Sequence, residues 1–134
     1  MKYILILFSV ILSHQVKAQS EYYTDSAGKT TIFSGSRIIS EDGVYDRDSV
    51  NNSYQSITVC INDYKRFIFL SDSCAEVGNY DLTKLYLEKA KDCRFQINEY
   101  RKVIYRNLSI LKKIIENSDM PTNKKEELIE ALGI

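Results

Sequence analysis

Three cysteines are the residues of this sequence best able to do chemistry: Cys60, Cys74 and Cys93. Outside the cytosol two of them could form a disulfide, and the odd count leaves one thiol over. The alternative is that all three are small apolar core residues, because each falls on the apolar stripe of a predicted helix. Catalysis by a cysteine nucleophile is disfavoured, because the predicted mature chain offers no histidine partner to activate the thiol.

The turn of a predicted helical hairpin decides which cysteines could be joined. If the turn is centred on Gly78-Asn79, Cys60 and Cys93 are offset by about 6 Å along the helix axis, and Cys74 and Cys93 by about 15 Å. The Cα atoms of a disulfide lie within ~7 Å of each other. The candidate disulfide is therefore Cys60–Cys93, and it requires a small shift of the hairpin register.

Most enzyme and metal chemistry is disfavoured by composition and spacing. The only histidine, His14, lies in a predicted signal peptide, so the mature chain has no imidazole. The acidic run Asp42, Asp46 and Asp48 lacks the glycine and the later oxygen ligand of a calcium loop. Ala27-Gly28-Lys29-Thr30 lacks the first glycine of a phosphate-binding loop. We therefore predict no enzyme, no catalytic residue, no metal ligand and no cofactor.

Basic residues concentrate in one segment of a nearly neutral chain. From Lys84 to Lys113 there are nine bases and three acids, although the whole chain has 18 of each. Lys91, Lys102 and Lys113 recur every eleven residues, which places them on one side of a helix. They form a candidate partner-contact strip for an acidic protein or an anionic membrane surface. The alternative is a solvated face partly neutralised by acids of the preceding helix.

Residues 1–18 have the layout of a cleaved signal peptide. Lys2 supplies the positive start, Tyr3 to Leu12 is nearly all apolar, and Val16-Lys17-Ala18 resembles a cleavage site. The apolar run is shorter than the ~20 residues of a membrane-spanning helix. We expect cleavage after Ala18 and a periplasmic or secreted location.

Residues 19–52 are predicted to be a flexible polar leader. They are rich in Ser, Asp, Thr and Gly, which favours disorder. The alternative is a small β-hairpin, in which Thr31–Ser34 and Arg37–Ser40 flank a two-residue turn at Gly35-Ser36. An isolated two-stranded hairpin is marginally stable in water, so disorder is the preferred interpretation.

Residues 53–134 are predicted to form a helical domain. Apolar residues recur at spacings of three and four over two long segments, which predicts helices at about 53–77 and 82–117. Asn52 is the expected cap of the first helix, and the short connection at Gly78 predicts an antiparallel hairpin. A third helix is expected at about 123–132, after the break at Pro121. The predicted fold class is all-α, with coiled-coil packing of the two long helices.

The turn of this hairpin resembles part of a known repeat. Gly78, Tyr80, Thr83 and Ala90 are similar to the second half of a tetratricopeptide repeat over about twenty residues. The helix then continues through Ile97, and no second copy follows at that period. The resemblance indicates a tight helix hairpin and assigns no family.

The expected function is that of an exported, non-enzymatic interaction or structural protein, such as a subunit of an envelope assembly. Another protein is the expected partner, with peripheral membrane contact and homo-oligomerisation as further options, and nucleic acid is not expected. The alternative is a carrier that holds a small apolar ligand between aromatic residues of the helices. Those aromatic residues are Tyr54, Tyr64, Phe67, Phe69, Tyr86, Phe95, Tyr100 and Tyr105.

Overall fold

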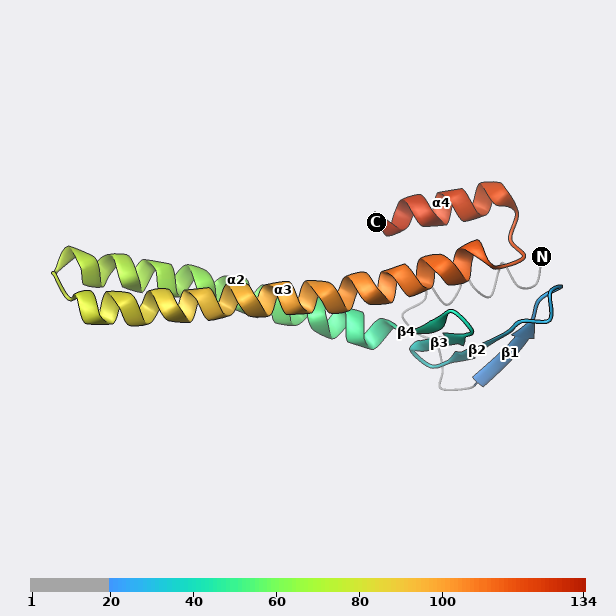
Figure 1. Cartoon of the computed structure of the whole chain (residues 1–134), viewed down its shortest axis with the longest axis horizontal. Coiled ribbons are helices and arrows are strands. Elements are labelled where there is room, and N and C mark those ends of the chain that lie inside the picture. The colour runs from blue at the N-terminus through green and yellow to red at the C-terminus, as the bar shows by residue number, and fades with distance from the viewer. Residues whose placement is uncertain (1–19) are drawn as a thin grey trace. The chain divides into compact units, whose positions relative to one another are not determined.

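The computed structural model describes residues 20–134, which form four strands followed by three helices (Figure 1). Helices make up 68% of the described chain, which confirms the three-helix expectation. The all-α fold class is wrong in part, because an antiparallel sheet precedes the helices. The predicted signal peptide, residues 1–18, lies outside the described residues.

The sheet is an antiparallel meander in the order β1-β2-β3-β4. Its strands are β1 (Ser20–Thr24), β2 (Thr30–Ser34), β3 (Arg37–Ser40) and β4 (Gly43–Asp46). β2 and β3 are the hairpin around Gly35-Ser36, with Ser34 opposite Arg37. Two further strands extend that hairpin, so the segment expected to be a flexible leader is ordered.

One row of side chains explains why this polar segment folds. Phe33, Ile38 and Tyr45 lie opposite one another on three adjacent strands and are all buried. Tyr23 adds an edge-to-face contact with Phe33, at 5.2 Å between ring centroids. Each strand thus contributes an apolar residue to the same face, and that face requires a cover.

The C-terminal part of α3 (Tyr80–Glu116) belongs to the same compact unit as the sheet and supplies the cover. Leu111, Ile114 and Ile115 are buried there, with Ile115 fully so. The approach is close at Gly43, where a Cβ atom would stand 3.3 Å from the side chain of Ile110. The sheet is therefore stabilised by a helix about 70 residues further along the chain.

α2 (Arg47–Glu76) begins six residues before the predicted start, and its cap is Asp46 rather than Asn52. The Asp46 carboxylate accepts a hydrogen bond from the backbone N–H of Asp48 at 3.0 Å, as an N-cap residue does. The same carboxylate accepts from Ser36 Oγ and pairs with Arg37, while the backbone N–H of Asp46 donates to Asn107 of α3. These contacts join the end of β4 to the start of α2.

α2 and α3 form an antiparallel helical hairpin, as expected (Figure 1). α2 ends at Glu76, and Gly78, two residues later, adopts a φ of +76°. The N–H of Gly78 donates to the carbonyl of Ala75 and that of Asn79 to the carbonyl of Cys74, which together make a Schellman motif. Asn79 then caps α3 through a hydrogen bond from the N–H of Leu82, so the helix starts two residues before the predicted start at residue 82.

Contacts between the two long helices define a packing seam. Phe67 stacks on Tyr86 at 6.2 Å between centroids, and the Thr83 hydroxyl donates to the carbonyl of Ser71 at 3.4 Å. Along both helices the least exposed positions alternate at spacings of three and four, which is the heptad period. We call this set the seam: Val50, Ser53, Ile57, Cys60, Tyr64, Phe67, Ser71 and Cys74 on α2, with Thr83, Tyr86, Ala90, Cys93, Ile97, Tyr100 and Ile104 on α3.

α4 (Thr122–Leu132) follows the break at Pro121 and returns along the C-terminal part of α3 (Figure 1). Leu128, Ile129 and Leu132 are half-buried. Lys125 Nζ donates to the backbone carbonyl of Glu116 at 2.8 Å, which satisfies one of the free acceptors at the end of α3.

The chain divides into two compact units. One combines the residues up to Asp48 with Tyr105–Ile134, and the other is Ser49–Ile104. We call them the sheet unit and the hairpin unit. Among the described residues, no helix has the length and apolarity to cross a membrane.

Candidate functional site

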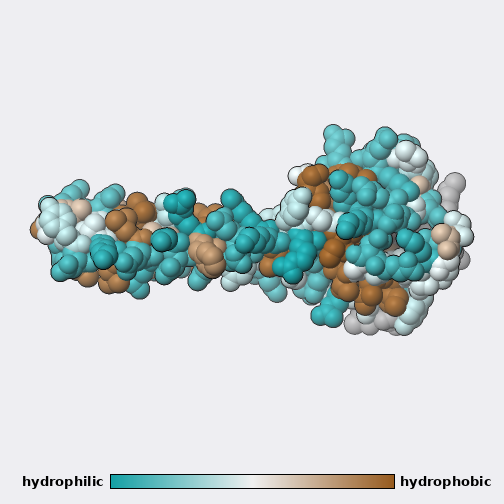
Figure 2. Space-filling model, viewed as in Figure 1, coloured by the Kyte–Doolittle hydropathy of each residue, from teal (hydrophilic) through white to brown (hydrophobic). Residues whose placement is uncertain are grey.

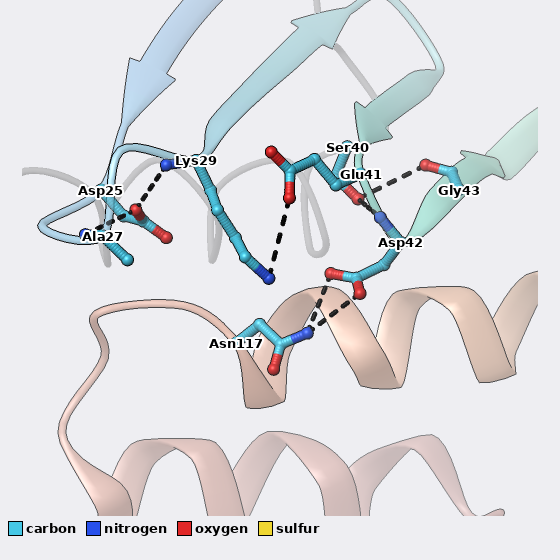
Figure 3. A network of polar contacts seen from close by, with 8 residues as sticks. All are labelled: Asp25, Ala27, Lys29, Ser40, Glu41, Asp42, Gly43 and Asn117. Atoms are coloured by element: carbon cyan, nitrogen blue, oxygen red, sulfur yellow. Dashed lines mark hydrogen bonds and ion pairs between the residues drawn. The ribbon is translucent and has the colours of Figure 1, made fainter.

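The sheet unit contains a polar cluster at the end of the sheet where the β1–β2 and β3–β4 turns lie (Figure 3). Asp25 organises the first turn: its Oδ1 accepts from the backbone N–H groups of Ala27 at 2.9 Å and Lys29 at 2.8 Å. In the second turn the N–H of Asp42 donates to Ser40 Oγ at 3.1 Å. In both turns, short polar side chains thus accept hydrogen bonds from nearby backbone N–H groups and stabilise the turn.

Both turns are attached to the end of α3 and the turn that follows it. The side-chain amide of Asn117 donates to both carboxylate oxygens of Asp42, at 3.0 Å each. Asp119 accepts from the backbone N–H of Ser26 at 3.2 Å and from its hydroxyl at 3.0 Å. Two carboxylates, one on each side of the contact, hold the sheet against the helix end.

A cavity of about 60 Å³ lies among these groups. Tyr23, Phe33 and Ile114 supply its apolar wall, and the polar cluster supplies the rest. Lys29 extends toward this space, with Nζ 3.9 Å from the Glu41 carboxylate (Figure 3). The volume is well below the ~300–1,000 Å³ of pockets that enclose small organic ligands.

The chemistry of this cluster is structural. The carboxylates of Asp25, Asp42 and Asp119 already accept hydrogen bonds from the chain. Over residues 20–134 no three His, Cys, Asp or Glu side chains are grouped so that they could hold a metal ion. The cluster joins segments about 75 to 93 residues apart in sequence and thereby fixes the sheet.

The predicted disulfide partners lie in the hairpin unit. Cys60 and Cys93 are both buried on the seam, whereas Cys74 is half-buried nearer the turn, and all three are free thiols. The pairs Phe67–Tyr86 and Ser71–Thr83 fix a register in which Cys60 and Cys93 are level with each other. The register shift that a Cys60–Cys93 disulfide requires is thus present, and the disulfide itself stays a prediction.

Burial raises the pKa of the Cys93 thiol above its ordinary value, and the nearby Asp63 carboxylate and Cys60 thiol raise it further. A raised pKa keeps the thiol protonated near neutrality, and a protonated thiol is a poor nucleophile. Cys60 Sγ lies 3.5 Å from Gln96 Oε1, which is a hydrogen bond rather than an activating contact. The site therefore has the character of a core position.

The three lysines of the predicted partner-contact strip are all exposed on α3. Lys102 pairs with Glu99 of the same helix at 2.8 Å. Lys91 and Lys102 belong to the hairpin unit, whereas Lys113 belongs to the sheet unit. Whether the strip contacts a partner stays a prediction.

The sequence interpretation missed Asp46, which joins β4, α2 and α3. In the sequence Asp46 stands in an acidic run with Asp42 and Asp48, a pattern that suggests a calcium ligand rather than a helix cap. The available signal was the order of residues: a short strand ending in Asp, directly before a helical pattern, is a typical N-cap. Asn117 and Asp119 were missed because their partners are distant in sequence.

Comparison of this chain with protein-family models, with curated proteins and with solved structures finds no match.

Proposed function

We propose that this protein is exported and acts as a non-enzymatic interaction or structural protein, as a subunit of an assembly in the cell envelope. The observation that carries the proposal is the position of the exposed large hydrophobic side chains. Of fourteen in the described chain, ten lie in the hairpin unit. Single exposed apolar residues are ordinary, but their concentration on one part of a chain is typical of a binding surface.

The most exposed of these residues surround the turn between α2 and α3. Val77 is 80% exposed, Tyr80 74% and Phe69 70%. Hydrophobic side chains are visible at this end of the helical hairpin in Figure 2. Covering such side chains with a partner would remove apolar surface from water, at about 25 cal/mol for each Å².

The small side chains of the seam also support this proposal. Ser53, Ser71 and Ala90 are among its most buried positions, and these small side chains bury little apolar area. We propose that α2 and α3 form an antiparallel coiled coil whose larger apolar residues are left for a partner. An isolated pair of helices with such a seam gains stability when a further surface packs on it.

The experiment is purification of the native protein from its host under mild conditions, followed by measurement of stoichiometry. We expect a complex with one defined protein, from which the partner dissociates as salt rises, because exposed charges are screened within ~10 Å at 0.1 M salt. The triple change Lys91→Glu, Lys102→Glu and Lys113→Glu tests the predicted strip and should abolish the complex without altering the melting temperature.

The matched control reverses three other bases of α3 and α4: Arg106→Glu, Lys112→Glu and Lys124→Glu. It makes the same change in net charge, and we expect the complex to survive. If the wild-type protein runs as a monomer with no stoichiometric partner at low salt, the interaction function is wrong. If both triple variants keep the partner, only the lysine strip is wrong.

A further inference from the structure

The seam divides the surface of the helical hairpin into two sides. Residues directly before a seam position lie on one side of the hairpin. Residues directly after a seam position lie on the other side. Contacts between the two helices identify the first side: Lys89 Nζ lies 5.7 Å from the centre of the Phe67 ring, and the Gln96 side chain accepts a hydrogen bond from Cys60. Asp63 lies on this side too, near Cys93.

The opposite side carries a row of apolar residues at seven-residue spacing. On α2 these are Tyr54, Ile61 and Ile68, and on α3 they are Tyr80 and Leu87. In an antiparallel pair these positions of both helices point to the same side. Four of the five are exposed, from 37% for Ile61 to 74% for Tyr80, and Ile68 is half-buried.

The same side is strongly basic. Each of three lysines follows an apolar member by four residues, one helical turn later, and two arginines continue the row of α3. These bases are Lys65, Lys84, Lys91, Arg94 and Arg101, all exposed. Asp72 is the acid of this side. We call the five apolar and five basic residues the basic apolar face.

The bases of this face are not neutralised by the chain. The ion pairs found over the described residues use other cations, and the one in the hairpin unit that involves α2 joins Arg66 to Asp63 on the opposite side. None of the five bases takes part in an ion pair there. A face that combines exposed apolar side chains with uncompensated positive charge complements an apolar and acidic partner.

We propose that the basic apolar face binds an acidic amphipathic helix of a partner protein, laid along α2 and α3. The inference rests on the proposed interaction function and names its surface and the chemistry of its partner. The α3 row from Tyr80 to Arg101 covers about 31 Å, so a helix of about 21 residues matches it. Its apolar residues fall at spacings of three and four, and Asp or Glu residues flank them.

The depth of the apolar row favours a helix over a membrane. Ile61, at 37%, is the least exposed of the four exposed members, and Ile68 is half-buried. Side chains projecting from a helix can reach recessed positions, whereas a bilayer surface contacts first the groups that protrude. A second copy of this chain is disfavoured, because two such faces would bring ten positive charges together.

The test uses the full chain and a synthetic helical peptide of 21 residues, with Leu at the heptad core positions and Glu beside them. Fluorescence anisotropy should show binding that weakens as salt rises, and no binding of the same peptide with Lys in place of Glu. Arg94→Glu with Arg101→Glu should weaken binding at least tenfold. The control, Arg106→Glu with Lys112→Glu, reverses two bases elsewhere on α3 and should change it less than twofold.

A photo-crosslinking residue at position 87 of the chain in its native host then reports the natural partner. We expect the crosslinked peptide to be acidic and amphipathic, and the same residue placed at Leu82, on the other side, to give none. The proposal is overturned if the acidic peptide binds both double variants equally. It is also overturned if the chain binds anionic phospholipid vesicles and not the peptide. A third contrary result is a homodimer of this chain that Leu87→Asp converts to monomer. If a stoichiometric native partner still binds the variant Arg94→Glu with Arg101→Glu, the interaction function holds, but the basic apolar face is not its binding surface.

Discussion

At the scale of single residues, the seam register determines which cysteines can form a disulfide. Cys60 and Cys93 are buried and level with each other, whereas Cys74 is half-buried and nearer the turn. We predict that protein exported to an oxidising compartment contains a Cys60–Cys93 disulfide and a free Cys74. Closing a loop of this length stabilises a fold by about 2–4 kcal/mol.

Peptide mapping without reductant checks this disulfide. Cys74→Ser should leave both the bridge and the melting temperature unchanged, whereas Cys60→Ser should lower the melting temperature of oxidised protein to that of reduced protein. A bridge that includes Cys74, or three free thiols in oxidised material, would show the prediction to be wrong.

Asp46 offers a second prediction at this scale. Asp46→Ala removes the N-cap of α2 and the pairing with Arg37, so we expect a loss of about 1–2 kcal/mol in the free energy of unfolding. Asp46→Asn should lose less, because an amide oxygen can also cap a helix. Urea denaturation measures both.

The control for Asp46 is Asp48→Ala, which removes an exposed acid of the first turn that caps nothing. Its cost should be only a few tenths of a kcal/mol, from the helix dipole. Equal losses for Asp46→Ala and Asp48→Ala would mean that the cap and its contacts contribute nothing measurable.

At the scale of elements, the helices were predictable and the sheet was not. Apolar residues at spacings of three and four over more than twenty residues leave little choice but a helix, and Gly78 marks the end of α2. The strands have four or five residues each, too few for alternation to stand out. The row of Phe33, Ile38 and Tyr45 is stable because Leu111 and its neighbours on α3 cover it. Local sequence patterns cannot reveal a contact between segments so far apart.

The candidate surfaces show the same division. The exposed lysines were evident from spacing, but a period of eleven residues joins positions in two compact units. The basic apolar face follows a period of seven, and that period can be assigned only once Phe67–Tyr86 and Ser71–Thr83 fix which residues face the partner helix.

α4 gives a prediction at the element scale. A chain ending at Met120 lacks the half-buried Leu128, Ile129 and Leu132, so we expect a loss of roughly 1–3 kcal/mol. A chain ending at Asn117 also lacks buried Met120 and the contact between Asp119 and Ser26, so it should lose about 2 kcal/mol more. Thermal melting of both chains tests whether α4 and its turn stabilise the sheet unit. An unchanged melting temperature for the chain ending at Asn117 would show that they do not.

At the scale of the whole molecule, the predicted export signal ends close to the first strand. Cleavage after Ala18 would leave one residue before β1, which begins at Ser20. We therefore expect the mature protein to start at Gln19 and to keep every strand. Intact-mass measurement of protein from the native host checks this start, and a chain that still carries Met1 would contradict it.

The seam has a consequence for how the length of the helical hairpin can change. Because its positions repeat every seven residues on both α2 and α3, an insertion keeps the packing only when each helix gains a whole repeat. Any other number of residues rotates the side chains beyond it away from the opposite helix. The length of the hairpin can therefore change only in steps of about 10 Å, and intermediate lengths would disrupt the packing of the seam.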